Sequence, residues 1–225
     1  MNLTERAYNY LKTLERDSEW NTSEEETLKY FKSLNVDFSK KVLETQLKYG
    51  GLRLEIASNG RFRIKVNFIS KSHIDKKLQI YSERIDDDII FKFDNGEKPN
   101  IYYITNSGAI CSKDEDNPRK IHYTYENLNI KIEQYALLNE YNQFTYFSSG
   151  NYHVFDFDKL KTELSDFEFI SECSDNFNFC CKNDQVLILV SPWLEGKGKY
   201  LNIYGINNDS WKGIIKRLQS KEIIE

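Results

Sequence analysis

The spacing of apolar residues divides the chain into a helical N-terminal part and a longer part with strand-like alternation. Near the N-terminus, apolar residues recur at helical spacing after Asn2, which predicts an amphipathic helix with Asn2 as its cap. Glu5 stands where it can reach back to that cap, as in a capping box. The apolar positions of this predicted helix are Leu3, Ala7, Tyr10, Leu11 and Leu14.

Capping residues indicate two further helices. Thr22 and Ser23 precede three glutamates, whose carboxylates are favourable at the positive end of a helix, and an apolar stripe follows. Ser39 is expected to cap a third helix. Gly50 is expected to end that helix in the left-handed conformation, and Gly51 frees the chain to turn.

From Leu52 onward the apolar period changes to two, which predicts an antiparallel meander. Asn59-Gly60 is typical of a hairpin turn between the first two strands. Turn-forming residues separate the later runs and lie at 86–88, 94–96 and 106–108. The predicted later strands span residues 78–81, 89–93, 101–105 and 109–111. A helix over 126–141 then presents one apolar face that can cover the sheet.

The last third of the chain repeats this pattern. A short helix is expected after Asp156, and a closing helix carries Trp211, Ile214, Ile215 and Leu218 at helical spacing. Strands are expected between them, at 167–171, 177–181, 186–190 and 200–206. The fold class is therefore α+β, with N-terminal helices and a meander sheet covered by helices in residues 1–145. Residues 146–225 form either a second small α+β lobe or an extension of the first sheet, packed on the first domain.

Composition limits the classes of partner. The chain has 225 residues, of which 40% are hydrophobic and 14% aromatic, enough to bury a sizeable core. Its net charge of −4 gives no general attraction for nucleic acid or anionic membranes and favours a basic partner. The N-terminus lacks the apolar core of a signal peptide and no run is long enough to span a membrane, so a cytoplasmic protein is expected.

Few residues suggest chemistry. His153, Asp156 and Asp158 come closest to a metal or hydrolase cluster, but Asp156 better fits a helix cap. The acidic loop 112–118 lacks the central glycine and the distant glutamate of a calcium loop. Four cysteines without CxxC spacing are expected to be reduced and mostly buried, and Cys180 and Cys181 should point to opposite faces of a strand. No catalytic residue, metal or cofactor is expected.

Several segments together resemble the SMI1/KNR4, or SUKH, superfamily. They are the helix ending in the YGG of residues 49–51, the meander, the YYITNSGAI run from 102, the acidic loop and the IEQYALLNEY helix ending at 141. The resemblance covers about residues 20–142. It implies an α+β domain without enzymatic activity, which in bacteria is commonly an immunity protein that binds and neutralises a cognate toxin, often a nuclease.

If the toxin is basic, acidic loops would speed the encounter and compete with phosphate. The candidate partner-binding residues are Asp86, Asp87, Asp88, Asp114, Glu115, Asp116 and Trp193. Two alternatives stay open. One is a regulatory interaction module of the same fold, and the other is a hydrolase that uses His153, Asp156 and Asp158.

Overall fold

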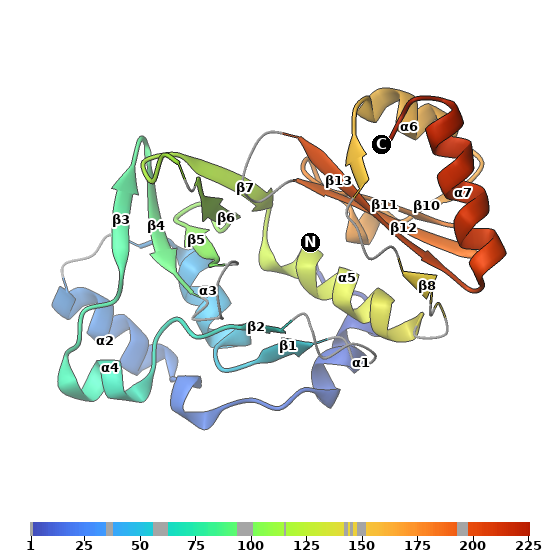
Figure 1. The fold of residues 1–225 in the computed structure, drawn as a ribbon. Coiled ribbons are helices and arrows are strands. Elements are labelled where there is room, and N and C mark those ends of the chain that lie inside the picture. Colours follow the sequence, from blue (N-terminus) through green and yellow to red (C-terminus); the bar gives the residue numbers. More distant parts are fainter. Residues whose placement is uncertain are drawn as a thin grey trace.

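The computed structural model has an α+β fold with antiparallel sheets and describes residues 2–34, 38–55, 63–93, 101–114, 116–141, 144, 146–147, 152–192 and 198–225. Figure 1 shows one sheet on each side of a central helix. That helix is α5 (Leu128–Glu140), which follows directly on the last strand of the first sheet. The N-terminal helix α1 (Glu5–Thr13) packs on α5.

Local capping fixes the N-terminal helices. Thr4, not Asn2, caps α1, because its hydroxyl accepts from the amide of Ala7 at 3.3 Å. At α2 (Glu24–Leu34), Ser23 and Glu26 bond reciprocally, side chain to backbone, as in a capping box. Ser39 caps α3 (Lys40–Tyr49) as expected. A short 3-10 helix, η1 (Ser18–Trp20), lies between α1 and α2.

The left-handed glycine after α3 is Gly51, not Gly50 as the sequence predicted. Gly50 has a φ of −53°, whereas Gly51 has a φ of +83°. A Cβ atom on Gly51 would come within 2.4 Å of the Asp17 carbonyl oxygen. Both the backbone conformation and the close approach of Asp17 therefore require a glycine at this position.

The first sheet is a five-stranded meander in the order β3-β4-β5-β6-β7, with all neighbours antiparallel. Its strands are β3 (Ser82–Ile85), β4 (Asp88–Lys92), β5 (Tyr103–Thr105), β6 (Ile110–Lys113) and β7 (Ile121–Tyr125). The earlier strands β1 (Arg53–Glu55) and β2 (Arg63–Lys65) pair separately, and the predicted Asn59-Gly60 turn lies outside the described residues. The prediction was wrong at 78–81, which is not a strand, and it missed α4 (Lys71–Lys76) and β7.

The last third forms its own sheet instead of extending the first. The order is β10-β11-β12-β13-β8, with β9 also on β13. Its strands are β8 (Tyr146–Phe147), β9 (Tyr152–Val154), β10 (Glu168–Phe169), β11 (Phe179–Lys182), β12 (Val186–Pro192) and β13 (Lys199–Gly205). The helices of this part are α6 (Phe157–Glu163), η2 (Ser171–Cys173) and α7 (Asn208–Ser220), and α6 and α7 lie on the outer side in Figure 1.

The core has a part on each side of α5. Ile130 and Ile132 join the core of the first half, whereas Leu137 packs with Cys180 of the second sheet. Helix α5 thus buries more than the single face predicted, as a helix between two layers must. Cys181 faces the opposite core, so the predicted alternation of the two cysteines is confirmed, and all four cysteines are free and buried. None of the described helices has the length and apolar character needed to cross a bilayer.

Candidate interaction surface

The first sheet is strongly curled. Tyr123 on β7 donates to the carboxylate of Asp88 on β4 at 3.0 Å, and Lys113 on β6 donates to Glu83 on β3. Each pair is separated by two intervening strands, so a flat sheet would place their backbones about 14 Å apart or more. The contacts therefore form because the sheet bends around its concave face. The buried residues enclosed on that face are Ile85, Ile90, Tyr103 and Cys111.

Tyr81, directly before the edge strand β3, has a side chain that is held in place by hydrogen bonds. Tyr81, which is 45% exposed, donates to Glu83 and accepts from the Lys113 ammonium at 2.6 Å. The Tyr81 and Tyr103 rings lie 5.8 Å apart. Hydrogen bonds from Lys113 and Tyr81 lower the pKa of Glu83, so this carboxylate stays ionised at neutral pH. Tyr81 is thus an exposed side chain whose orientation is already fixed.

The three aspartates of the predicted turn at 86–88 have different positions in the structure. Ile85 pairs with Asp88, which leaves Asp86 and Asp87 as a two-residue turn at the exposed tip between β3 and β4. Asp86 has a φ of 51°, a conformation that aspartate tolerates better than most residues. Asp88 instead lies within β4 and accepts the Tyr123 hydroxyl. Asp86 and Asp87 are therefore exposed to solvent, whereas Asp88 holds the curved sheet together through its hydrogen bond from Tyr123.

We call the exposed edge formed by Leu78, Tyr81, Asp86 and Asp87 the β3 surface. Leu78 is as exposed as Tyr81, at 45%. The sequence missed both side chains, because the segment 78–81 was expected to be a strand of the meander. The signal in the sequence was the occurrence of Leu78, Ile80 and Tyr81 directly before the charged strand β3.

The second acidic loop is organised internally. The Asp114 carboxylate accepts from the amides of Asp116 and Asn117 at 3.0 and 2.9 Å, and His122 Nε2 lies 2.7 Å from its other oxygen. Asp114 therefore holds its own turn, whereas Asp116 is exposed. Glu115 and Trp193, the remaining predicted contact residues, lie outside the described residues.

We expect Asp114 to titrate at about pH 2. The hydrogen bond from His122 and those from Asn117 and Asp116 lower its pKa from 3.8 to about 2. Because the folded-state pKa is lowered, the contribution of Asp114 to stability is present above pH 3.8 and is lost as the pH falls through about 2. The Asp114 carboxyl ¹³C shift, followed against pH, measures this value. In His122→Ala it should move back toward 3.8, and an unchanged midpoint would refute the stated cause.

The hydrolase candidates do not assemble. Asp156 caps α6, since its carboxylate accepts from the Lys159 amide at 2.9 Å, and Asp158 is 96% exposed beside Lys161. The His153 ring packs edge-on against Phe155 at 5.4 Å. Within the described ranges, no group of three His, Cys, Asp or Glu side chains is placed to hold a metal ion.

The second half has exposed aromatic residues of its own. Phe155 and Phe169 are more than half exposed. Phe169 stacks on Phe179 at 5.6 Å, and Lys161 and Lys199 lie 4.1 and 4.6 Å from the ring of Phe157. Phe169 is thus supported by Phe179 of the neighbouring strand, and two lysines lie against the Phe157 ring, in contrast to the two carboxylates of the Asp86-Asp87 tip.

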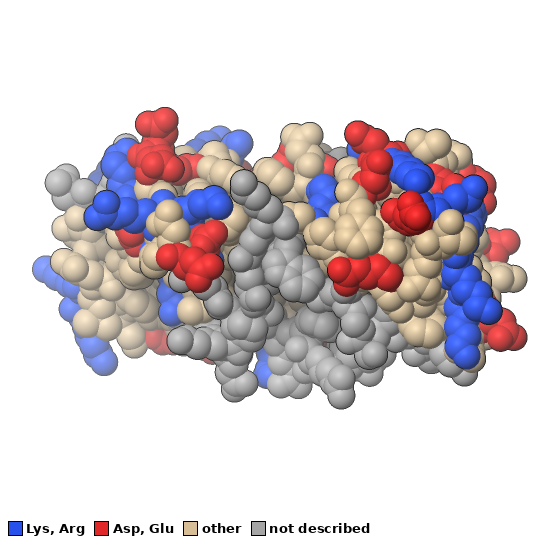
Figure 2. Space-filling view, turned by 45° about the horizontal axis from the view of Figure 1, so that its top comes forward, with Lys and Arg blue, Asp and Glu red and all other residues tan. Residues whose placement is uncertain are grey.

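Charge is mixed over the surface as a whole. In Figure 2, basic and acidic side chains intermingle on both halves, and no patch of one sign covers the face in view. Long-range attraction for a polyanion is therefore not the dominant feature of this face. No protein-family model, curated protein or solved structure matches the chain.

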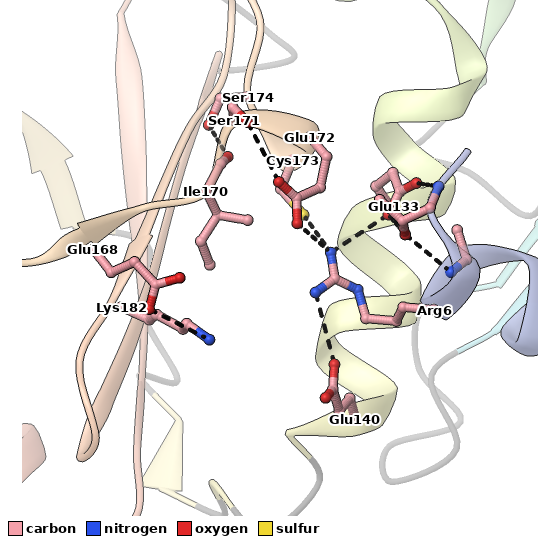
Figure 3. A network of polar contacts seen from close by, with 12 residues as sticks. Arg6, Glu133, Glu140, Glu168, Ile170, Ser171, Glu172, Cys173, Ser174 and Lys182 are labelled. Carbon is pink, nitrogen blue, oxygen red and sulfur yellow. Dashed lines mark hydrogen bonds and ion pairs between the residues drawn. The ribbon is translucent and has the colours of Figure 1, made fainter. Parts of the chain in front are cut away.

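An ion network around the buried carboxylate of Glu133 joins the two halves away from the β3 surface. In Figure 3 the Arg6 guanidinium of α1 lies between Glu133 and Glu140 of α5 and Glu172 of η2. Glu133 is only 2% exposed and also accepts from the Thr4 amide and hydroxyl at 2.6 and 2.7 Å. Because every oxygen of this carboxylate is engaged inside the protein, the network serves to fix α1, α5 and η2 together.

Proposed function

We propose that this chain is a non-catalytic binding protein of the immunity type, which neutralises a cognate bacterial toxin. The resemblance to the SMI1/KNR4 superfamily suggests the class, and the β3 surface supplies the chemistry. The observation that carries the proposal is Tyr81, an exposed aromatic side chain braced by Lys113 and Glu83. Tyrosine is over-represented among the residues that dominate protein interfaces.

The bracing of Tyr81 favours binding for an energetic reason. An exposed tyrosine usually loses rotamer freedom when a partner covers it, and that loss reduces the affinity. Here the hydroxyl is already held by two hydrogen bonds, so most of that freedom is lost in the free protein. Leu78, three residues earlier in the chain and equally exposed, adds apolar area, and the curled sheet gives Tyr81 a rigid support.

The acidic tip indicates the sign of the partner's charge. Asp86 and Asp87 project from the same strand that follows Tyr81, about 17 Å away at strand spacing. This span fits within one standard interface of about 800 Å² per partner. Two exposed carboxylates within one interface's span of an aromatic anchor are suited to a basic protein, such as a nuclease, whose own surface attracts phosphate.

Protection of growing cells tests this proposal. The chain is expressed together with the toxin candidate encoded beside its own gene, and we expect it to restore growth. Asp86→Lys with Asp87→Lys should abolish or strongly reduce protection, because the tip then repels a basic partner. The matched control is Asp158→Lys with Asp184→Lys, which changes net charge from −4 to 0 equally but alters exposed residues of the second half.

Three outcomes have distinct meanings. Protection that is lost only in the tip variant supports the proposal. Binding without protection favours a regulatory interaction module of the same fold. No binding and no protection by the wild-type chain would refute the toxin partner.

A further inference from the structure

The ammonium group of Lys131 on α5 has fewer hydrogen-bond acceptors around it than it has N–H donors. Its Nζ donates to Tyr125 Oη at 2.7 Å and lies 5.0 Å from the centroid of the Tyr135 ring. It is 4.9 Å from the Tyr125 centroid, which places it at the hydroxyl end of that ring and not over its face. In the part of the chain that the structure describes, Lys131 has no other hydrogen bond and no carboxylate at ion-pair distance.

The groups at this corner are hydrogen-bond donors. An ammonium carries three N–H donors and no acceptor, and Tyr125 accepts only one of them. Because Tyr125 Oη accepts from Lys131, its own hydrogen points elsewhere and is a further donor. Tyr125 and Tyr135 are each only 4% exposed, so their rings provide an apolar environment next to these donors.

The nearby titratable groups do not neutralise Lys131. Asp175 acts electrostatically on Tyr125, together with Tyr102 and Tyr200. Its carboxylate, however, already accepts from the amides of Glu126, Phe177 and Asn178 and from the Asn178 side chain, at 2.7 to 2.9 Å. Lys131 keeps some contact with solvent, but the packing around it lowers its pKa to about 8, as expected for an ammonium without a counter-ion.

We propose that Lys131 and Tyr125 form a binding site for a small oxyanion, either phosphate or carboxylate, with the Tyr135 ring as one wall. The two N–H groups of Lys131 that Tyr125 does not accept, and the Tyr125 hydroxyl hydrogen, are suited to a charged oxygen, because hydrogen bonds to an ionised acceptor are the strong ones. The bound anion would supply the missing counter-charge. The site is separate from the β3 surface and does not depend on the proposed function.

NMR of the full chain with ¹³C-labelled lysine tests this site. The Lys131 signal is assigned by its absence in Lys131→Met, and its titration is followed in chloride, with added inorganic phosphate, and with added acetate. An anion at Nζ should move the titration from about 8 toward 10.5, since a negative charge favours the ammonium form. The response to phosphate against acetate identifies the class of oxyanion.

Variants separate a built site from general charge effects. Tyr125→Phe removes one donor and should weaken anion binding about tenfold or more. Lys212→Met removes an exposed lysine of α7 and should leave the affinity unchanged. If neither phosphate nor acetate moves the Lys131 titration in the wild-type chain, water solvates this ammonium and the proposal is wrong. Equal affinities in wild type and Tyr125→Phe would also overturn it.

Discussion

Replacing Glu133 with alanine is expected to lower the free energy of unfolding by about 3 kcal/mol, as when one partner of a buried ion pair is removed. The change deletes the acceptor of the Thr4 amide and hydroxyl and removes a carboxylate from Arg6. Arg6 keeps Glu172 at 2.9 Å and the exposed Glu140, but the Thr4 amide and hydroxyl lose their acceptor, and Arg6 Nε is already buried without a partner. Urea unfolding followed by circular dichroism measures the loss.

Glu140→Ala is the matched control for that experiment. Glu140 lies on the same helix and pairs with the same Arg6, at 3.7 Å, but its side chain is 58% exposed. Exposed ion pairs contribute little, so the expected loss is about 0.5 kcal/mol or less. Equal effects of the two variants would show that burial of Glu133 does not determine its contribution.

Replacing Lys131 with methionine is expected to stabilise the protein at pH 7 by up to about 2 kcal/mol, in a buffer without phosphate or carboxylate. The lowering of the Lys131 pKa from 10.5 to about 8 means that its charged form is disfavoured by folding. Below pH 8 both states are protonated, so this cost is fully present and amounts to at most about 3 kcal/mol, because the partial exposure of Lys131 reduces it. Loss of the Tyr125 hydrogen bond offsets about 1 kcal/mol of the gain.

The pH dependence gives the same prediction independently. Between pH 8 and 10.5 the unfolded chain binds more protons at Lys131 than the folded chain, so wild-type stability rises with pH relative to the variant. The advantage of Lys131→Met should therefore shrink from pH 7 to pH 9.5 in urea unfolding. A variant that is less stable at pH 7, or a difference that does not vary with pH, would contradict a desolvated ammonium.

The elements that could be predicted are those decided within a few residues. Ser23 and Ser39 begin their helices as expected, because a side-chain hydroxyl and an amide three residues later settle the matter locally. The burial of Leu137 could not be predicted in this way. It depends on strands β11 and β12 of the second sheet, which lie more than forty residues further along the chain.

In the candidate site, too, local features could be predicted and long-range contacts could not. The exposed turn at Asp86 and Asp87 follows from turn chemistry and was predicted. The roles of Asp88 and Tyr81 were not predictable, because both depend on the curl that brings Tyr123 and Lys113 across the sheet. No periodicity within a single strand carries information about that curvature.

The most direct test of the binding proposal is the dissociation constant of the purified chain with a toxin candidate encoded beside its gene, measured by calorimetry. We expect one-to-one binding that Asp86→Lys with Asp87→Lys weakens at least tenfold and Tyr81→Ala about thirtyfold. Asp158→Lys with Asp184→Lys should leave it within about threefold, since these residues lie outside the β3 surface. Absence of binding, or equal weakening by both charge-reversed pairs, would contradict a binding protein that acts through the β3 surface.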